Sequence, residues 1–129
     1  MVNVPWINPS SSVYQQANAA FQKAHNRYLD TNSSYAYTGI LVIADILERA
    51  ASTDPDKIVA ATRQTNFTIH PVVSGPIQFN EKGDNTGALT ALIQVQPDAD
   101  LLKRVKIVAP KEFAQSDKIV FPAPQLWKR

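Results

Sequence analysis

Two tyrosines that stand two residues apart are the side chains of this sequence best suited to bind a ligand. Tyr35 and Tyr37 lie at the expected start of a helix, where unpaired backbone N–H groups and the helix dipole favour an anion. A tyrosine ring can cover an apolar group while its hydroxyl makes one hydrogen bond. We therefore predict a ligand-binding site at Tyr37 and Tyr35. The alternative is that both rings are core residues that cover the helix end.

The side chains needed for catalysis or metal binding are sparse and scattered. The chain contains no cysteine, and neither His25 nor His70 has a partner at metal-ligand spacing. No Gly-x-Ser-x-Gly turn provides a serine nucleophile. The segment Asn80–Asn85 has some likeness to a calcium loop, but Lys82 stands among its oxygen ligands and no distal glutamate follows. We predict no enzymatic activity, no cofactor and no metal, and an ordinary turn in that segment.

Positive charge is concentrated near the C-terminal end. The whole sequence has a formal net charge of +2, whereas residues 101–129 carry 7 Lys and Arg against 2 Asp and Glu. A basic segment of this kind can bind nucleic acid. No aromatic stacking residues are interleaved among the charges, so we instead predict a solvated strand and tail without a nucleic-acid partner. The basic residues concerned are Lys103, Arg104, Lys106, Lys111, Lys118, Lys128 and Arg129.

Hydrophobic periodicity predicts three helices in the first half of the chain. A capping box at Ser12 opens a helix over 12–29, in which apolar residues recur at helical spacing. A second helix over 34–51 has no polar face for three turns, so we expect it to be covered on most sides. Asp54, which is followed by a proline, caps a third helix that ends near Arg63.

The second half of the chain predicts strands and turns. Residues 76–80 and 91–96 alternate at period two around a turn-rich loop, which indicates a hairpin with a long connection. A further strand is expected over 104–108, followed by an extended tail that contains prolines. With three helices, then a hairpin and a further strand, the predicted fold class is α/β.

No segment of the sequence predicts a membrane span or a signal peptide. The longest apolar run, residues 39–44, is interrupted by Asp45 and is too short for a bilayer. The residues after Met1 lack a basic region, and Pro5 stands where the apolar stretch of a signal peptide would be. We expect that an exported form would carry its signal peptide upstream of these residues or would have had it removed.

Several motifs in fixed order resemble the C-terminal portion of a type I periplasmic solute-binding protein. The similarity is to the branched-chain amino acid (Leu/Ile/Val-binding) receptors of ABC transporters, and it covers nearly the whole chain. Each motif is weak alone, whereas the ordered set is specific. The motifs are Ser34-Tyr-Ala-Tyr, the helix that ends Ala44-Asp-Ile-Leu-Glu-Arg-Ala, Ser52-Thr-Asp-Pro-Asp, Gly75-Pro-Ile-Gln-Phe-Asn-Glu-Lys-Gly-Asp-Asn, Leu92-Ile-Gln-Val-Gln, and Val120-Phe-Pro-Ala-Pro with Trp127.

The resemblance implies a fold of two α/β lobes joined by three crossover segments, with the ligand enclosed between them. Residues 1–129 would be a single C-terminal fragment of that fold. About 1–85 would enter and form part of the first lobe, and about 86–129 would return to the second. The tyrosine aligned with Tyr37 lies close to the ligand cleft in that family, whereas the loops that hold the ligand's carboxylate would lie outside this chain.

The resemblance also implies a function and a location. The protein would be the substrate-binding component of an ABC transporter, which captures a small carboxylate-bearing solute such as a branched-chain amino acid in the periplasm. Its partner would be a membrane permease. The alternative is a stand-alone, oligomerising α/β interaction module derived from such a protein and without solute binding. Because helix 34–51 is so apolar, we expect the chain either to self-associate or to pair with the remainder of the receptor.

Overall fold

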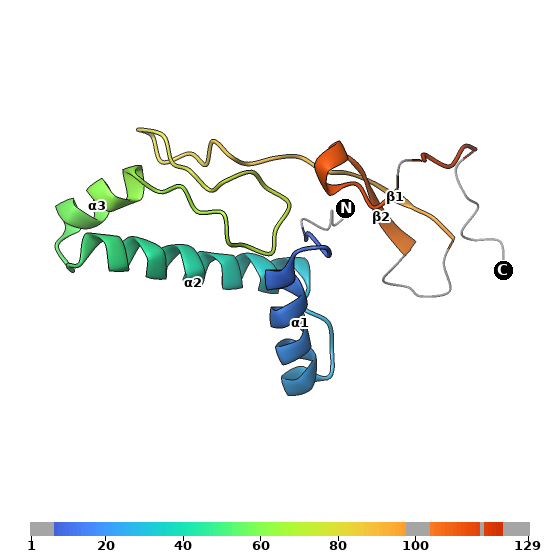
Figure 1. Cartoon of the computed structure of the whole chain (residues 1–129), viewed down its shortest axis with the longest axis horizontal. Helices are drawn as coiled ribbons and strands as arrows, with labels where there is room; N and C mark the ends of the chain where they lie inside the picture. Colours follow the sequence, from blue (N-terminus) through green and yellow to red (C-terminus); the bar gives the residue numbers. More distant parts are fainter. Residues whose placement is uncertain (1–6, 98–103, 117, 123–129) are drawn as a thin grey trace. The chain divides into compact units, whose positions relative to one another are not determined.

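The computed structural model describes residues 7–97, 104–116 and 118–122, with helices in the first half and strands in the second (Figure 1). This described part is a small mixed fold of helices and strands, which is compatible with the predicted α/β class. It divides into two compact units, one ending at Leu89 and the other beginning at Thr90. The elements are α1 (Ser12–His25), α2 (Thr31–Ala50), α3 (Pro55–Arg63), β1 (Leu92–Val95), β2 (Val105–Ala109) and the 3₁₀-helix η2 (Lys111–Phe113).

The ends of α1 are set by local hydrogen bonds. Ser11 is the N-cap, because its hydroxyl accepts from the Tyr14 N–H at 3.4 Å, so the predicted cap at Ser12 is wrong by one residue. Asn26 adopts a left-handed conformation with φ 51°. The helix therefore ends at His25, four residues before the predicted end.

α3 begins and ends where the sequence predicts. The Asp54 carboxylate accepts from the N–H groups of Asp56 and Lys57 at 3.0 and 3.2 Å. Pro55 occupies the first helical position, where no intrahelical N–H bond is needed. The predicted cap and both helix ends are confirmed.

The core of the first unit lies where α3 and the segment after it run along one side of α2 (Figure 1). Burying these apolar side chains against one another is what holds the helices and the segment together. The buried members are Val42, Ile46, Ala61 and Ile77, and the partly buried members are Ala50, Ile58, Phe67 and Phe79.

The predicted hairpin between 76–80 and 91–96 is wrong. Within 76–80, Ile77 pairs with Phe67 and Phe79 pairs with Asn85, each as an isolated antiparallel bridge. Strand β1, which corresponds to 91–96, pairs instead with β2. Alternation identified β1 but not the isolated bridges at 76–80, and it does not specify the partner of a strand, which depends on contacts distant in sequence.

Two glycines close the base of the loop 75–87. The Gly75 N–H donates to the Gly87 carbonyl at 2.9 Å. A Cβ atom at Gly87 would lie 1.7 Å from the carbonyl oxygen of Pro76, so a side chain does not fit there. We call this pair of glycines the loop neck.

In the second unit, β1 and β2 form an antiparallel pair whose register shifts between Leu92 and Ile93. The side-chain amide of Gln94 donates to the Val120 carbonyl and accepts from the Val120 N–H, both at 2.8 Å. The Gln96 side-chain amide also donates to the Lys118 carbonyl at 3.0 Å, so two glutamine side chains hold the segment 118–122. The tail that was predicted to be extended after residue 108 instead forms the 3₁₀-helix η2, and its part beyond residue 122 lies outside the described residues.

Candidate ligand-binding site

The two predicted site tyrosines lie on α2, but not in its first turn. α2 begins at Thr31 rather than at 34, and the Ser34 N–H already donates to the Asp30 carbonyl at 2.9 Å. The backbone N–H groups of Tyr35 and Tyr37 therefore lie inside the helix, and the argument that they offer free donors to an anion is wrong. Both side chains are partly exposed, Tyr35 by 45% and Tyr37 by 40%.

Asp30 occupies the position at the α2 N-terminus that an anionic ligand would take. Its carboxylate accepts from the Ser33 N–H at 2.8 Å. This hydrogen bond is the main reason that the pKa of Asp30 is lowered, with a smaller contribution from the Arg27 guanidinium 3.6 Å away. The helix end is thus already satisfied by a negative charge of its own. A ligand carboxylate would be repelled there.

The structure does not bring the two tyrosines together. Residues two apart on an α-helix point about 160° away from each other, since each residue turns by about 100°. Tyr35 is 45% exposed, and its partial burial raises the pKa of its hydroxyl. Tyr37 precedes the exposed Ile40 by three residues, so the two share one side of α2. The geometry therefore offers one aromatic contact at a time rather than a tyrosine pair.

A polar pair on the buried side of α2 was missed by the sequence reasoning. Ser34 and Thr38 are buried beside the apolar core residues Val42 and Ile46, one helical turn apart from each other. The Thr38 hydroxyl donates to the Ser34 carbonyl at 2.7 Å. The Ser34 hydroxyl has no hydrogen-bond partner among the described residues. The i, i+4 spacing of these four residues is the signal that indicates which side of α2 is covered.

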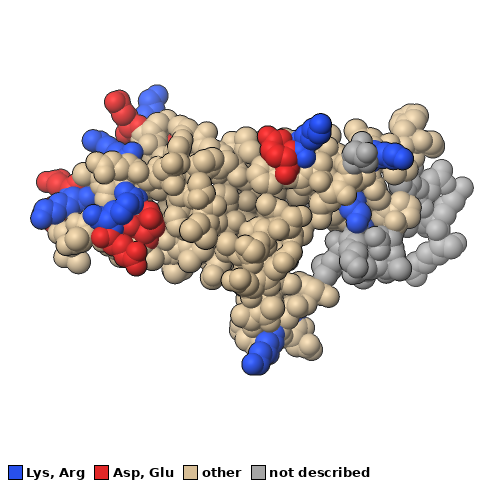
Figure 2. Space-filling view, viewed as in Figure 1, with Lys and Arg blue, Asp and Glu red and all other residues tan. Residues whose placement is uncertain are grey.

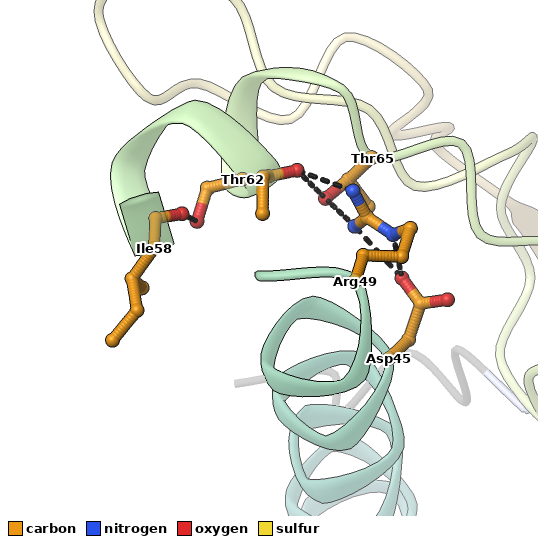
Figure 3. A network of polar contacts seen from close by, with 6 residues as sticks. Asp45, Arg49, Ile58, Thr62 and Thr65 are labelled. Carbon is orange, nitrogen blue, oxygen red and sulfur yellow. Dashed lines mark hydrogen bonds and ion pairs between the residues drawn. The ribbon is translucent and has the colours of Figure 1, made fainter. Parts of the chain in front are cut away.

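Arg49, the cation nearest to the end of α2, is already engaged (Figure 3). It donates to the Ala61 carbonyl at 2.5 Å and to the Thr65 hydroxyl at 2.8 Å, which ties α2 to the C-terminal end of α3. It also donates to the Asp45 carboxylate at 3.0 and 2.8 Å. Each guanidinium nitrogen thus has an acceptor, so this side chain is not available to bind a solute carboxylate.

The two histidines have separate structural surroundings. His70 is buried, with its ring nitrogens 3.2 Å from the carbonyl oxygens of Val72 and Gly75, so it holds this turn of the backbone. His25 lies at the end of α1 with its ring centroid 4.5 Å from that of Phe21. The His70 ring thus holds a backbone turn, and the His25 ring packs against an aromatic side chain of its own helix.

The segment Asn80–Asn85 is the predicted turn. The Asn80 side-chain oxygen accepts from the N–H groups of Lys82 and Asp84, both at 2.9 Å, and its amide nitrogen donates to the Asp84 carboxylate at 3.1 Å. The oxygens of this loop are therefore used to shape its own backbone. Across residues 7–97, 104–116 and 118–122, no group of three or more His, Asp or Glu could hold a metal ion.

The basic residues near the C-terminal end are only partly described. Arg104, Lys106, Lys111 and Lys118 belong to the described part of the second unit, and Arg104 and Lys106 each have an interaction partner. Lys106 lies on β2, so the predicted solvated strand carries at least one of these charges. Lys103, Lys128 and Arg129 lie outside the described residues.

Comparison with known protein families, with curated proteins and with solved structures finds no match to the chain. Among the helices of the described residues, none is both long and apolar enough to span a membrane. The site is therefore defined by its geometry alone: two half-exposed tyrosines that diverge around α2, of which Tyr37 shares a side of the helix with the exposed Ile40.

Proposed function

We propose that this chain is the C-terminal portion of the solute-binding receptor of an ABC transporter. In the intact receptor, two lobes would close around a small carboxylate-bearing solute such as a branched-chain amino acid. The closed form would then be presented to a membrane permease from the periplasm. Closure of this kind is a shift between two conformations, because the solute contacts both lobes only when they are shut.

The observation that carries the proposal is the division of the chain into two compact units. One unit ends at Leu89 and the other begins at Thr90, a few residues from the boundary expected for the two lobes near residue 85. A chain that leaves one lobe and returns to another is expected to form two units rather than one. The ordered motifs of the sequence support the same interpretation.

In this proposal Tyr37 lines one wall of the solute cleft. Its ring would contact the apolar side chain of the solute, and its hydroxyl would make one hydrogen bond. Tyr35 would have a lesser part, because it lies on the other side of α2. Since Asp30 caps the helix and Arg49 is engaged by its neighbours, the solute carboxylate would be held by the remainder of the receptor.

Calorimetry on the full-length receptor tests this proposal, with the solute identified by mass spectrometry of the purified protein. We expect Tyr37→Ala to weaken binding about tenfold, and Tyr37→Phe to weaken it less because the ring contact remains. Tyr28→Ala is the matched control, since Tyr28 is a similarly exposed tyrosine outside α2. Equal affinities for Tyr37→Ala and this control would contradict the site. Micromolar binding of leucine by the present chain alone would contradict the division of the site between two parts.

A second candidate function is a self-associating α/β module without solute binding. It is favoured by the apolar residues that α2 exposes, which include Ile40, Ile43 and Leu47. The DNA upstream of the Met1 codon separates the two candidates. An in-frame continuation with a signal peptide supports the receptor, whereas a promoter and ribosome-binding site there support the module.

A further inference from the structure

The exposed side of α2 carries a row of apolar residues at the spacing of a helix–helix contact. Ile40 is 66% exposed, Ile43 55% and Leu47 42%, and Ala36 extends the row by one turn. The successive intervals of four, three and four residues have a mean of about 3.7, close to the 3.6 residues per turn of an α-helix, so the four side chains lie along one side of α2. We call these four residues the α2 row.

The α2 row lies on a part of the helix that is almost free of charge. No charged residue stands between Thr31 and Ala44, and the charges of α2 are confined to its last turns at Asp45, Glu48 and Arg49. On the face seen in Figure 2, charged side chains gather around α3 and the C-terminal end of α2, and the middle of α2 carries none. The charged residues of α2 therefore all lie near its C-terminal end.

We propose that the α2 row packs against the α2 row of a second copy of this chain, with the two helices antiparallel. Under a two-fold axis between Ile40 and Ile43, the Ile40 side chain of each copy faces Ile43 of the other. Ala36 then faces Leu47, so a small side chain meets a large one at both ends of the contact. The α2 row of one copy thus fits the α2 row of the other, as a two-fold symmetric interface requires.

Charge selects the antiparallel orientation over the parallel one. Parallel helices would bring the two copies of Glu48 to the same end, and Leu47 would meet Leu47 while Ala36 met Ala36 across a gap. Antiparallel helices place each Glu48 beside the uncharged first half of the other α2. They also align the two helix dipoles favourably.

The exposed area sets the expected strength of the dimer. Each large side chain of the α2 row offers on the order of 100 Å², so the row with the neighbouring Tyr37 offers roughly 400–500 Å² per copy, against about 800 Å² in a standard stable interface. We therefore expect a dissociation constant on the order of 100 μM. The dimer would form at high protein concentration and dissociate on dilution.

Sedimentation velocity on the 129-residue chain, from about 5 to 500 μM, tests the proposal around the expected midpoint. The wild-type chain is expected to pass from monomer to dimer over this range. Ile40→Lys and Ile43→Glu are each expected to weaken association at least tenfold, because each buries two unpaired charges in the homodimer. An equimolar mixture of the two variants is expected to restore association. In the antiparallel register the new lysine faces the new glutamate, while the other Ile–Ile contact of the heterodimer is kept.

Val59→Lys is the matched control, because Val59 is an exposed apolar residue of α3 outside the α2 row. This variant is expected to associate as the wild type does. Circular dichroism is used to check that every variant is folded. A wild-type chain that stays monomeric at 500 μM overturns the proposal and leaves the remainder of the receptor as the occupant of the row. A dimer that persists in Ile40→Lys overturns the choice of surface. A mixture that does not associate overturns the antiparallel register.

The dimer through the α2 row deepens the second candidate function, self-association, and it does not depend on a solute or on the proposed receptor function. Self-association is measured on the present chain without any ligand, whereas the receptor function is measured by solute binding to the full-length protein. Either proposal can therefore fail while the other stands.

Discussion

The buried and exposed sides of α2 differ in composition, and the more apolar side is the exposed one. The buried side includes two hydroxyl residues, whereas the exposed side includes three large aliphatic residues. What decides burial here is the position of α3 and the segment that follows it, because these cover one side of the helix. Hydrophobicity alone would have covered the other side as well. The buried residues are Ser34, Thr38, Val42 and Ile46, and the exposed apolar residues are Ala36, Ile40, Ile43 and Leu47.

The largest difference between the two sides is expected on truncation of an isoleucine. Ile46→Ala should lower the free energy of unfolding by about 2–4 kcal/mol, because it removes buried methyl groups and leaves a cavity in the core. Ile40→Ala, on the exposed side, should change it by less than about 0.5 kcal/mol when the chain is monomeric. Urea unfolding at low protein concentration measures both. Equal losses in the two variants would mean that the sides are not distinct in the folded chain.

A smaller effect is expected at the N-terminal end, which both sides of α2 share. Asp30→Ala should lower the free energy of unfolding by about 1 kcal/mol, because the Ser33 N–H loses its acceptor. Asp30→Asn keeps a capping oxygen and should lose only a few tenths of a kcal/mol. Thermal unfolding followed by circular dichroism compares the variants. If Asp30→Asn is as unstable as Asp30→Ala, the cap is not the source of the effect.

The same cap predicts a pH dependence. Because the pKa of Asp30 is lowered in the folded chain, its carboxylate stabilises the fold fully above its ordinary pKa of 3.8. This contribution is lost as the pH falls through the lower pKa of the folded state. The wild type should therefore lose its advantage over Asp30→Asn on acidification below about pH 4. A difference between the two that stays constant from neutral pH to pH 2 would exclude this linkage.

The smallest effect is expected at the buried polar pair. Ser34→Ala should leave stability unchanged or raise it by about 0.5 kcal/mol, because the variant removes a buried hydroxyl that lacks a partner. Thr38→Val should instead lower it by roughly 0.5–1 kcal/mol, because a hydrogen bond to the Ser34 carbonyl is lost. Parallel urea titrations would resolve the opposite signs. A clear loss in Ser34→Ala would show that its hydroxyl is bonded in solution.

Local signals predicted the helices well where the capping residue was unambiguous. α3 was predicted in full, since an aspartate, a proline and an acidic first turn point to one start. α1 and α2 offered several polar residues before their first turn, and the caps proved to be Ser11 and Asp30. The choice among neighbouring polar residues depends on backbone geometry that the sequence pattern does not specify.

The partners of the strands and the sides of α2 could not be predicted in the same way. Period-two alternation located β1, but it also predicted a strand at 76–80, where the structure has only isolated bridges that depend on contacts across the fold. In α2, a nearly continuous apolar run left the helical period too weak to separate the two sides. The polar residues Ser34 and Thr38 carried the missing information, since they mark the covered side. For the site, the sequence pointed to Tyr35 and Tyr37 but placed them in the first turn of the helix, because the cap at Asp30 was not predicted.

The loop neck at Gly75 and Gly87 determines where this part of the chain can vary. A methyl group at Gly87 would collide with the Pro76 carbonyl, so this position at the base of the loop does not accept a side chain. At the tip of the loop, Gly83 has φ 86° and is best kept as glycine, whereas the neighbouring Glu81 and Lys82 are exposed and open to substitution. The entropic cost of closing a loop also rises only slowly with its length. Because the chain contains no cysteine, a single one introduced at this tip would be a unique attachment point for a spectroscopic label. A label at the tip of this loop would report on the folded chain without any substitution in α2.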